Sequence, residues 1–266
     1  MELQVNGRTA YAYTGGKPFN ASLPCVVFVH GALHDHSGWA LLARWCAHHG
    51  HSVLALDLPG HLRSAGPALA SVEEAADWLL AVLTAAGVER AALVGHSMGS
   101  LMVLEAAGRA PQRASRLVLL GTAYPMPVAA ALLETALAEP LRAIDQVNAW
   151  SYTGLAAKPS FPGPGMWLHG ANRMLMRRVQ GGYAAGNLFH HEFSLCQRYQ
   201  GGLQAAAKVA CPSSFILGQA DQMTPPRLSN ALAAALKARV HLVPAGHNMV
   251  QEVPDAVLAA LRDALA

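Results

Sequence analysis

The sequence predicts an α/β protein in which a mostly parallel, doubly wound sheet carries a helical cap as an insertion. Three observations support this fold class. Short apolar runs alternate with helical segments near both ends of the chain. The run Cys25–Val29 is apolar throughout, which is typical of a strand buried on both faces of a parallel sheet. From about Tyr124 to Gln200 no convincing strand pattern occurs, which indicates inserted helices.

The first part of the chain alternates strands with helices. Asn6-Gly7 is a typical turn between two hairpin strands. Ser71 and Glu74 form a capping box at a helix start. The expected elements before the insertion are strands Leu3–Val5 and Thr9–Tyr13, strand Cys25–Val29, helix Trp39–His49, strand His51–Leu56, a helix from Ser71 to about Ala86, strand Ala91–Val94, helix Met98–Arg109 and strand Leu117–Leu120.

The alternation resumes after the insertion. The expected elements there are strand Ser213–Leu217, a helix from Pro226 to about Lys237, strand Val240–Val243 and helix Pro254–Leu265. Residues 1–122 and 201–266 are therefore predicted to form the core, and residues 123–200 the cap. The Pro- and Gly-rich stretch Lys158–Gly165 interrupts the helical pattern of the cap.

Composition narrows the class of protein. The chain has 266 residues, of which 53% are hydrophobic and 13% charged, enough to bury the core of one large domain. The net charge of +3 is scattered, so no nucleic-acid partner is expected. No signal peptide and no apolar run of membrane-spanning length is found, so a cytoplasmic location is the default. The four cysteines lack metal-site spacing and are expected to be buried free thiols. A homodimer is one oligomeric state that the sequence allows.

The segment Gly95-His96-Ser97-Met98-Gly99 is a G-x-S-x-G motif between a predicted buried strand and a predicted helix. A sharp turn there would strain Ser97 and expose its hydroxyl group. Gly95 and Gly99 would let the strand and the helix approach closely. The first amides of the helix would point toward negative charge that develops during attack. Ser97 is thus the candidate nucleophile, and it needs a base to accept its proton.

The chain resembles the α/β-hydrolase superfamily over nearly its whole length, and the resemblance implies the α/β-hydrolase fold. Besides the motif around Ser97, the family pattern has an apolar strand that ends in His-Gly, here His30-Gly31. The resemblance implies that an oxyanion is bound by the backbone N–H groups of Met98 and of Ala32, with Leu33 as the alternative to Ala32. Asp57, in a loop that is structural in the family, precedes the serine and is rejected as the triad acid.

The triad acid and base are expected after late strands. Asp221 follows the strand Ser213–Leu217, and His247 follows the last strand. The order Ser97, Asp221, His247 is the chain order of this fold. His247 would accept the Ser97 proton and return it to the leaving group, while Asp221 would fix the tautomer of His247.

Candidate substrate contacts are less specific. His30, His96, Met126, Trp150 and Trp167 are the candidates, although large side chains of a cap more often serve packing. Other apolar cap residues that could line the entrance are Phe161, Met166, Met174, Met176, Tyr183 and Phe189. The pair His34 and His36 is expected to be solvated rather than to bind a metal, because no second ligand cluster is spaced suitably.

These features predict a serine hydrolase, of the carboxylesterase type, without a cofactor or metal. It would cleave a small or medium apolar ester through an acyl-enzyme intermediate. The same triad serves lactonases, thioesterases, C–C bond hydrolases and perhydrolases, and fold does not separate them. A non-catalytic ligand receptor and a protein-interaction module are the alternatives from other classes.

Overall fold

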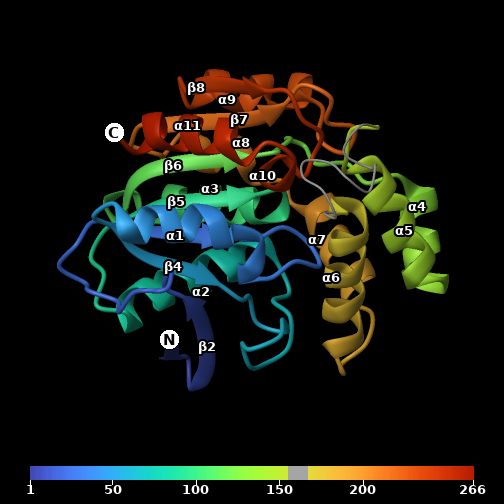
Figure 1. Ribbon diagram of the computed structural model, residues 1–266, viewed down its shortest axis with the longest axis horizontal. Helices are drawn as coiled ribbons and strands as arrows, with labels where there is room; N and C mark the ends of the chain where they lie inside the picture. Colours follow the sequence, from blue (N-terminus) through green and yellow to red (C-terminus); the bar gives the residue numbers. More distant parts are fainter. Residues whose placement is uncertain (155–166) are drawn as a thin grey trace.

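The computed structural model describes residues 1–154 and 167–266. Within these ranges, eight strands form one sheet in the order β1-β2-β4-β3-β5-β6-β7-β8 (Figure 1). The pairs β1–β2 and β2–β4 are antiparallel, and all other neighbours are parallel. The strands are β1 Glu2–Val5, β2 Arg8–Tyr13, β3 Cys25–Val29, β4 Ser52–Leu56, β5 Ala91–His96, β6 Ala114–Leu120, β7 Ser213–Gly218 and β8 Arg239–Val243.

Helices cover both faces of this sheet. Helices α2 and α3 pack with Val27 and Leu93 on one face, and α1 and α11 pack with Val26 and Val94 on the other. Successive strand residues point to opposite faces, so both kinds of contact come from the same strands. The helices of the core are α1 Ala40–His48, α2 Val72–Ala85, α3 Met98–Arg109, α8 Gly202–Ala206, α9 Asn230–Ala235, α10 Met249–Glu252 and α11 Pro254–Leu265.

The predicted α/β-hydrolase fold is confirmed, including the hairpin and the helix cap at Ser71. Asn6 and Gly7 have positive φ, as a two-residue hairpin turn requires. The Ser71 side chain accepts a hydrogen bond from the Glu74 amide. One predicted helix is wrong in detail, because Pro226–Ser229 forms a 3₁₀ turn before the short α9. Helix α10 has four residues, too few to produce a periodic pattern.

Between β6 and α8 in sequence, the described residues form the helices α4 Ala130–Ala138, α5 Pro140–Trp150, α6 Leu168–Gly182 and α7 Leu188–Arg198. They gather beyond one edge of the sheet (Figure 1), and the described residues between β6 and β7 contain no strand. Leu132, Ile144, Met176 and Phe189 form an apolar cluster of their own with Leu33. The stretch Lys158–Gly165, Phe161 and Met166 lie outside the described residues. The division into core and cap stays a prediction.

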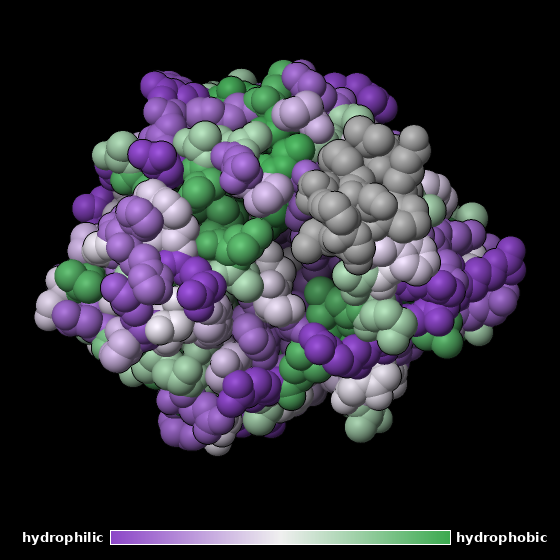
Figure 2. Space-filling model, viewed as in Figure 1, coloured by the Kyte–Doolittle hydropathy of each residue, from purple (hydrophilic) through white to green (hydrophobic). Residues whose placement is uncertain are grey.

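All four cysteines, Cys25, Cys46, Cys196 and Cys211, are free and buried, as predicted. Burial raises the pKa of Cys25 and of Cys46 to about 12. None of the helices in the described ranges is long and apolar enough to cross a membrane. Hydrophilic and hydrophobic residues are interspersed over the face seen in Figure 2, which is usual for a folded protein surface.

Candidate active site

Ser97 lies between the end of β5 and the start of α3, in a strained backbone conformation. Its φ of 53° and ψ of −120° lie outside the usual regions for a residue with a side chain. The Ser97 amide donates to the Leu120 carbonyl oxygen at 2.9 Å, and its own carbonyl accepts from the Ser100 amide at 2.9 Å. These backbone bonds hold the turn while the residue stays partly exposed.

Two glycines make this turn sterically feasible. A Cβ atom added to Gly95 would lie 2.3 Å from the Gly99 carbonyl oxygen. One added to Gly99 would lie 2.4 Å from the Val29 carbonyl oxygen. No side chain fits at either distance, so the close approach of β5, α3 and β3 requires glycine at both positions.

His247 and Asp221 form a buried pair beside this turn. His247 Nδ1 donates to Asp221 Oδ2 at 2.8 Å, so a neutral His247 keeps its lone pair on Nε2. The other Asp221 oxygen accepts from the amides of Met223 and Thr224, each at 2.8 Å. Burial by itself would raise the pKa of Asp221, but His247 and Thr224 outweigh it and bring the pKa to about 2. Asp221 is therefore a carboxylate at neutral pH.

Ser97 and His247 line one cavity of about 230 Å³, whereas Asp221, which is bonded to His247 Nδ1, is not among the lining residues. The loop after β6 packs against the His247 ring, because a Cβ atom added to Gly121 would lie 3.3 Å from His247 Cε1. His96 also lines the cavity, and its Nε2 donates to the His247 carbonyl oxygen at 3.0 Å. Burial and the neighbouring His247 lower the pKa of His96 to about 3. His96 is thus a neutral support of the His247 backbone.

The loop after β3 meets Ser97 from the other side. A Cβ atom added to Gly31 would lie 3.1 Å from Ser97 Cβ, and Ala32 lines the cavity. Met98 is the first residue of α3, where amides have no partner within the helix. The Leu33 amide instead donates to Glu192 Oε2 at 2.8 Å. The structure therefore does not support Leu33 as an oxyanion donor, and Ala32 and Met98 are the donors to consider.

The structure places two predicted substrate contacts, His30 and Trp167, outside the described lining of this cavity. His30 is buried outside this cavity lining, where its Nδ1 donates to the Gly31 carbonyl oxygen at 2.9 Å. Its Nε2 accepts from the Leu58 amide at 3.2 Å, so both ring nitrogens serve the backbone. Trp167 is 48% exposed, precedes α6 and stacks with His169. It does not appear in the cavity wall, unlike Trp150 and Met126.

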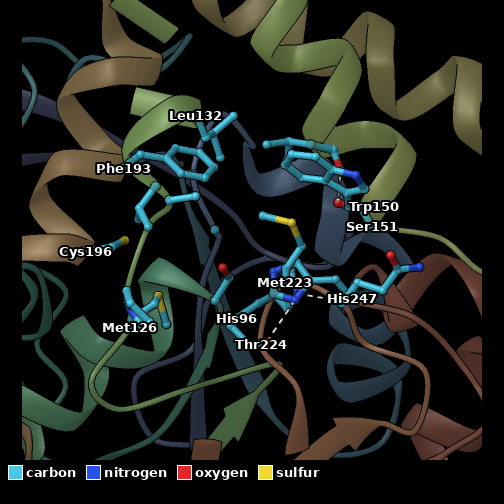
Figure 3. A pocket seen from close by; sticks show the side chains of 18 of the residues that line it. His96, Met126, Leu132, Trp150, Ser151, Phe193, Cys196, Met223, Thr224 and His247 are labelled. Atoms are coloured by element: carbon cyan, nitrogen blue, oxygen red, sulfur yellow. Dashed lines mark hydrogen bonds between the residues drawn. The ribbon is translucent and has the colours of Figure 1, made fainter. Parts of the chain in front are cut away.

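Helices α4 to α7 supply an apolar wall opposite the catalytic candidates. Figure 3 shows Leu132, Phe193 and Trp150 on one side of the cavity, with His96 and His247 facing them. Among the described residues, no Lys, Arg, Asp or Glu lines the cavity. The further lining residues are Gly31, Pro127, Val128, Ala129, Val147, Ser151, Met176, Cys196, Gln222, Met223 and Thr224. The cavity thus favours an uncharged, largely apolar ligand.

His34 and His36 have separate partners and are not simply solvated. His34 lines the cavity, with Nδ1 2.8 Å from the Ala32 carbonyl oxygen. His36 Nδ1 donates to Asp57 Oδ1 at 2.8 Å. Asp35, His36 and Asp57 are the one group in the described chain whose ligand atoms lie within 4.8 Å of one another. Asp57 also accepts from the backbone amides of His36 at 2.9 Å and of Arg63 at 3.4 Å, which agrees with the structural role expected for it.

Sequence reasoning missed two polar residues of this region. Thr224 Oγ1 donates to Asp221 Oδ2 at 2.8 Å, and it lies 3.1 Å from His247 Nδ1. Its position three residues after the acid is a local signal that could have identified it. Glu192, by contrast, is 159 residues from its partner Leu33, and no local pattern indicates that contact.

A comparison with protein families decides the broader assignment. The sequence model of the alpha/beta hydrolase fold family matches residues 24–252. The chain belongs to this family. Family membership supports a hydrolytic activity, in agreement with the strained serine and the buried pair of His247 and Asp221.

Individual relatives of this hydrolase differ in the activities that their names state. A putative carbamate hydrolase, RutD, of Klebsiella pneumoniae (strain 342) is 30% identical over 234 residues, which cover 84% of each chain. A 2-succinyl-6-hydroxy-2,4-cyclohexadiene-1-carboxylate synthase of Enterobacter sp. (strain 638) is 29% identical and covers 98% of this chain and 96% of its own. Among solved structures, the enol-lactonase from Burkholderia xenovorans LB400 has a TM-score of 0.79 at 21% identity and covers 100% of this chain and 99% of its own.

Proposed function

We propose that this hydrolase cleaves a carboxylic ester of a small or medium apolar substrate through an acyl-enzyme intermediate. One observation carries the proposal: the strained Ser97 shares a cavity with His247, whose Nδ1 is held by the Asp221 carboxylate. A serine hydroxyl becomes a competent nucleophile when an oriented imidazole accepts its proton. The buried pair would supply this oriented imidazole.

In the proposed reaction, Ser97 Oγ attacks the ester carbonyl carbon and its proton passes to His247 Nε2. The imidazolium then protonates the leaving alcohol, and an acyl group remains on Ser97. A water molecule attacks the acyl group with His247 again as the base, which releases the acid and restores Ser97. Asp221 orients His247 and stabilises the imidazolium, because its low pKa keeps it charged throughout.

Negative charge on the carbonyl oxygen needs donors in both attack steps. The amide of Met98 at the start of α3 and the amide of Ala32 beside Ser97 are proposed as this pair. Loss of one such donor typically costs about 2.7–4 kcal/mol of transition-state stabilisation. No cofactor enters these steps.

The cavity wall supports an uncharged substrate. Burial of a carboxylate or ammonium group is unfavourable unless a partner charge is present, and the described lining offers none. The apolar surface of Trp150, Leu132 and Phe193 would hold an aliphatic or aromatic group near Ser97. Lactones, thioesters and carbamates share the carbonyl chemistry and are the nearest alternatives; C–C bond cleavage, peracid formation and a non-catalytic receptor are weaker ones.

Labelling with a fluorophosphonate probe, followed by peptide mass mapping, tests the nucleophile. We expect the label on Ser97 and none on the Ser97→Ala variant. Nitrophenyl esters of increasing chain length, assayed beside an acyl-lactone, a thioester and an aryl carbamate, then identify the substrate class. A folded wild-type protein that neither takes up the label nor turns over any of these substrates would contradict the proposal and favour a receptor.

A further inference from the structure

Three successive residues of the loop after Ala32 are held by helices α6 and α7. The Leu33 amide donates to Glu192 Oε2 at 2.8 Å. His34 Nε2 lies 2.8 Å from Asn172 Oδ1, and Arg178 Nη2 donates to Asp35 Oδ2 at 2.7 Å. The loop that carries the proposed oxyanion donor is thus attached to inserted helices rather than to the sheet alone.

Leu33 is the critical member of this series. It is fully buried and has a φ of 54°, a conformation that side chains other than glycine rarely adopt. Leu33 directly follows Ala32, so the peptide plane between them contains both the Ala32 carbonyl group and the Leu33 amide. A bond to the Leu33 amide therefore restricts the orientation of Ala32.

Glu192 is well placed to hold this strained residue. Its side chain is almost fully buried, and its second oxygen, Oε1, lies 3.0 Å from Nε2 of the buried His61. Burial lowers the pKa of His61, but Glu192 outweighs burial and the pKa is raised. The buried imidazole beside one oxygen and the backbone donor on the other leave the carboxylate little freedom to rotate.

We propose that Glu192 is a positioning residue that aims the Ala32 amide at the substrate oxygen by holding the Leu33 amide. The inference rests on the proposed function, because it assigns Glu192 to the oxyanion site of that reaction. Helix α7 would then be part of the catalytic apparatus, in addition to covering the cavity.

The alternative is that Glu192 only stabilises the fold. The variants Glu192→Ala and Glu192→Gln separate the two roles, because glutamine keeps an oxygen that can accept from the Leu33 amide. For folded Glu192→Ala we expect a kcat about tenfold or more below wild type with KM within about twofold, since a misaimed donor weakens only the transition state. For Glu192→Gln we expect most of this loss to be recovered. Arg178→Ala, which removes the contact with Asp35 but leaves the Leu33 amide bonded, should lower kcat less than about threefold.

Inhibitor binding supplies a readout that a purely structural role would not change. A trifluoromethyl ketone forms a hemiketal with the serine, and the oxyanion of this hemiketal is stabilised by the two amide donors. The matching methyl ketone binds without forming a hemiketal, so it does not need these donors. In Glu192→Ala we expect the inhibition constant of the trifluoromethyl ketone to rise by the same factor as kcat/KM falls. That of the methyl ketone should stay within about twofold.

Equal weakening of both ketones, or an unchanged kcat in folded Glu192→Ala, would overturn the positioning role. Either result leaves the proposed function intact as long as wild-type Ser97 takes up the fluorophosphonate label. Failure of the proposed function would appear instead in the wild-type protein, as absence of labelling and turnover. The two failures are therefore distinguishable.

Discussion

Thr224 binds the same carboxylate oxygen of Asp221 that receives the His247 hydrogen bond. The Thr224 hydroxyl donates to Asp221 Oδ2 at 2.8 Å, and the Thr224 amide donates to Oδ1. The acid is thus held by one short segment of chain on both oxygens. Orientation of His247 depends on this carboxylate, so Thr224 should influence catalysis without touching the substrate carbonyl.

Replacement of Thr224 by valine removes the hydroxyl at nearly constant volume. A hydrogen bond to a charged group contributes about 1.5–3 kcal/mol, of which a part should appear in catalysis. We expect kcat to fall about tenfold, measured on the best ester of the substrate screen. Thr224→Ser keeps the donor and should recover most of the activity; equal losses in both variants would contradict this role.

Replacement of Asp221 by asparagine should have a much larger effect. Asparagine is neutral, so it cannot stabilise the His247 imidazolium as the Asp221 carboxylate does. Its NH₂ group would also favour the wrong imidazole tautomer. We expect kcat to fall by about 10⁴-fold, and combination with Ser97→Ala should add little, because the residues act as one unit. Near-full activity of Asp221→Asn would show that another group orients His247.

The low pKa of Asp221 predicts a specific dependence of stability on pH. The folded protein holds this proton less tightly than the unfolded chain, so the carboxylate stabilises the fold above the ordinary pKa of 3.8. This stabilisation, about 2 kcal/mol, should disappear as the pH falls from 3.8 toward 2. Urea unfolding of wild type and Asp221→Asn should show a larger difference in free energy at about pH 6 than at about pH 3. A constant difference would contradict the shift.

Two partly exposed tryptophans should respond differently to truncation. Trp150 lines the cavity, whereas Trp167 lies outside its wall and stacks with His169. Loss of a large apolar contact should reduce kcat/KM of Trp150→Ala for an apolar ester about tenfold or more. Trp167→Ala is the matched control and should stay within about twofold of wild type. The opposite order would place the substrate elsewhere.

The glycines of the strand–helix turn should tolerate no side chain. Alanine at Gly99 would bring Cβ to 2.4 Å from the Val29 carbonyl oxygen, and backbone cannot easily move away. We expect the free energy of unfolding to fall by about 2 kcal/mol or more. Gly181→Ala, in α6, where the added Cβ would meet no atom within 4 Å apart from the local helix backbone, should leave the free energy of unfolding unchanged or raise it slightly. Chemical denaturation of both variants compares the two sites.

Local sequence patterns predicted the fold and the residues that follow its strands. The turn at Ser97 is encoded by a strand, a G-x-S-x-G motif and a helix in immediate succession, so it required no knowledge of tertiary contacts. Asp221 and His247 could be predicted from the sequence because both follow strands that end at the same edge of the sheet. Their catalytic roles remain predictions that the geometry supports.

Side-chain direction could not be predicted in the same way. His30 directly precedes Gly31 and Ala32, which line the cavity, yet its ring points toward the Leu58 amide of a different loop. Trp167 precedes α6, and the face it occupies depends on how that helix packs. The bond between Leu33 and Glu192 joins residues 159 positions apart, and only the folded chain shows it.

The four buried thiols have a practical consequence for work on this hydrolase. A thiol with a raised pKa is a poor target for alkylating reagents, because the thiolate is the reactive form. A single cysteine placed at an exposed position such as Met174, on α6, should therefore accept a maleimide dye selectively in the otherwise native chain. Fluorescence from that dye would test whether α6 moves during turnover, without removal of any native cysteine.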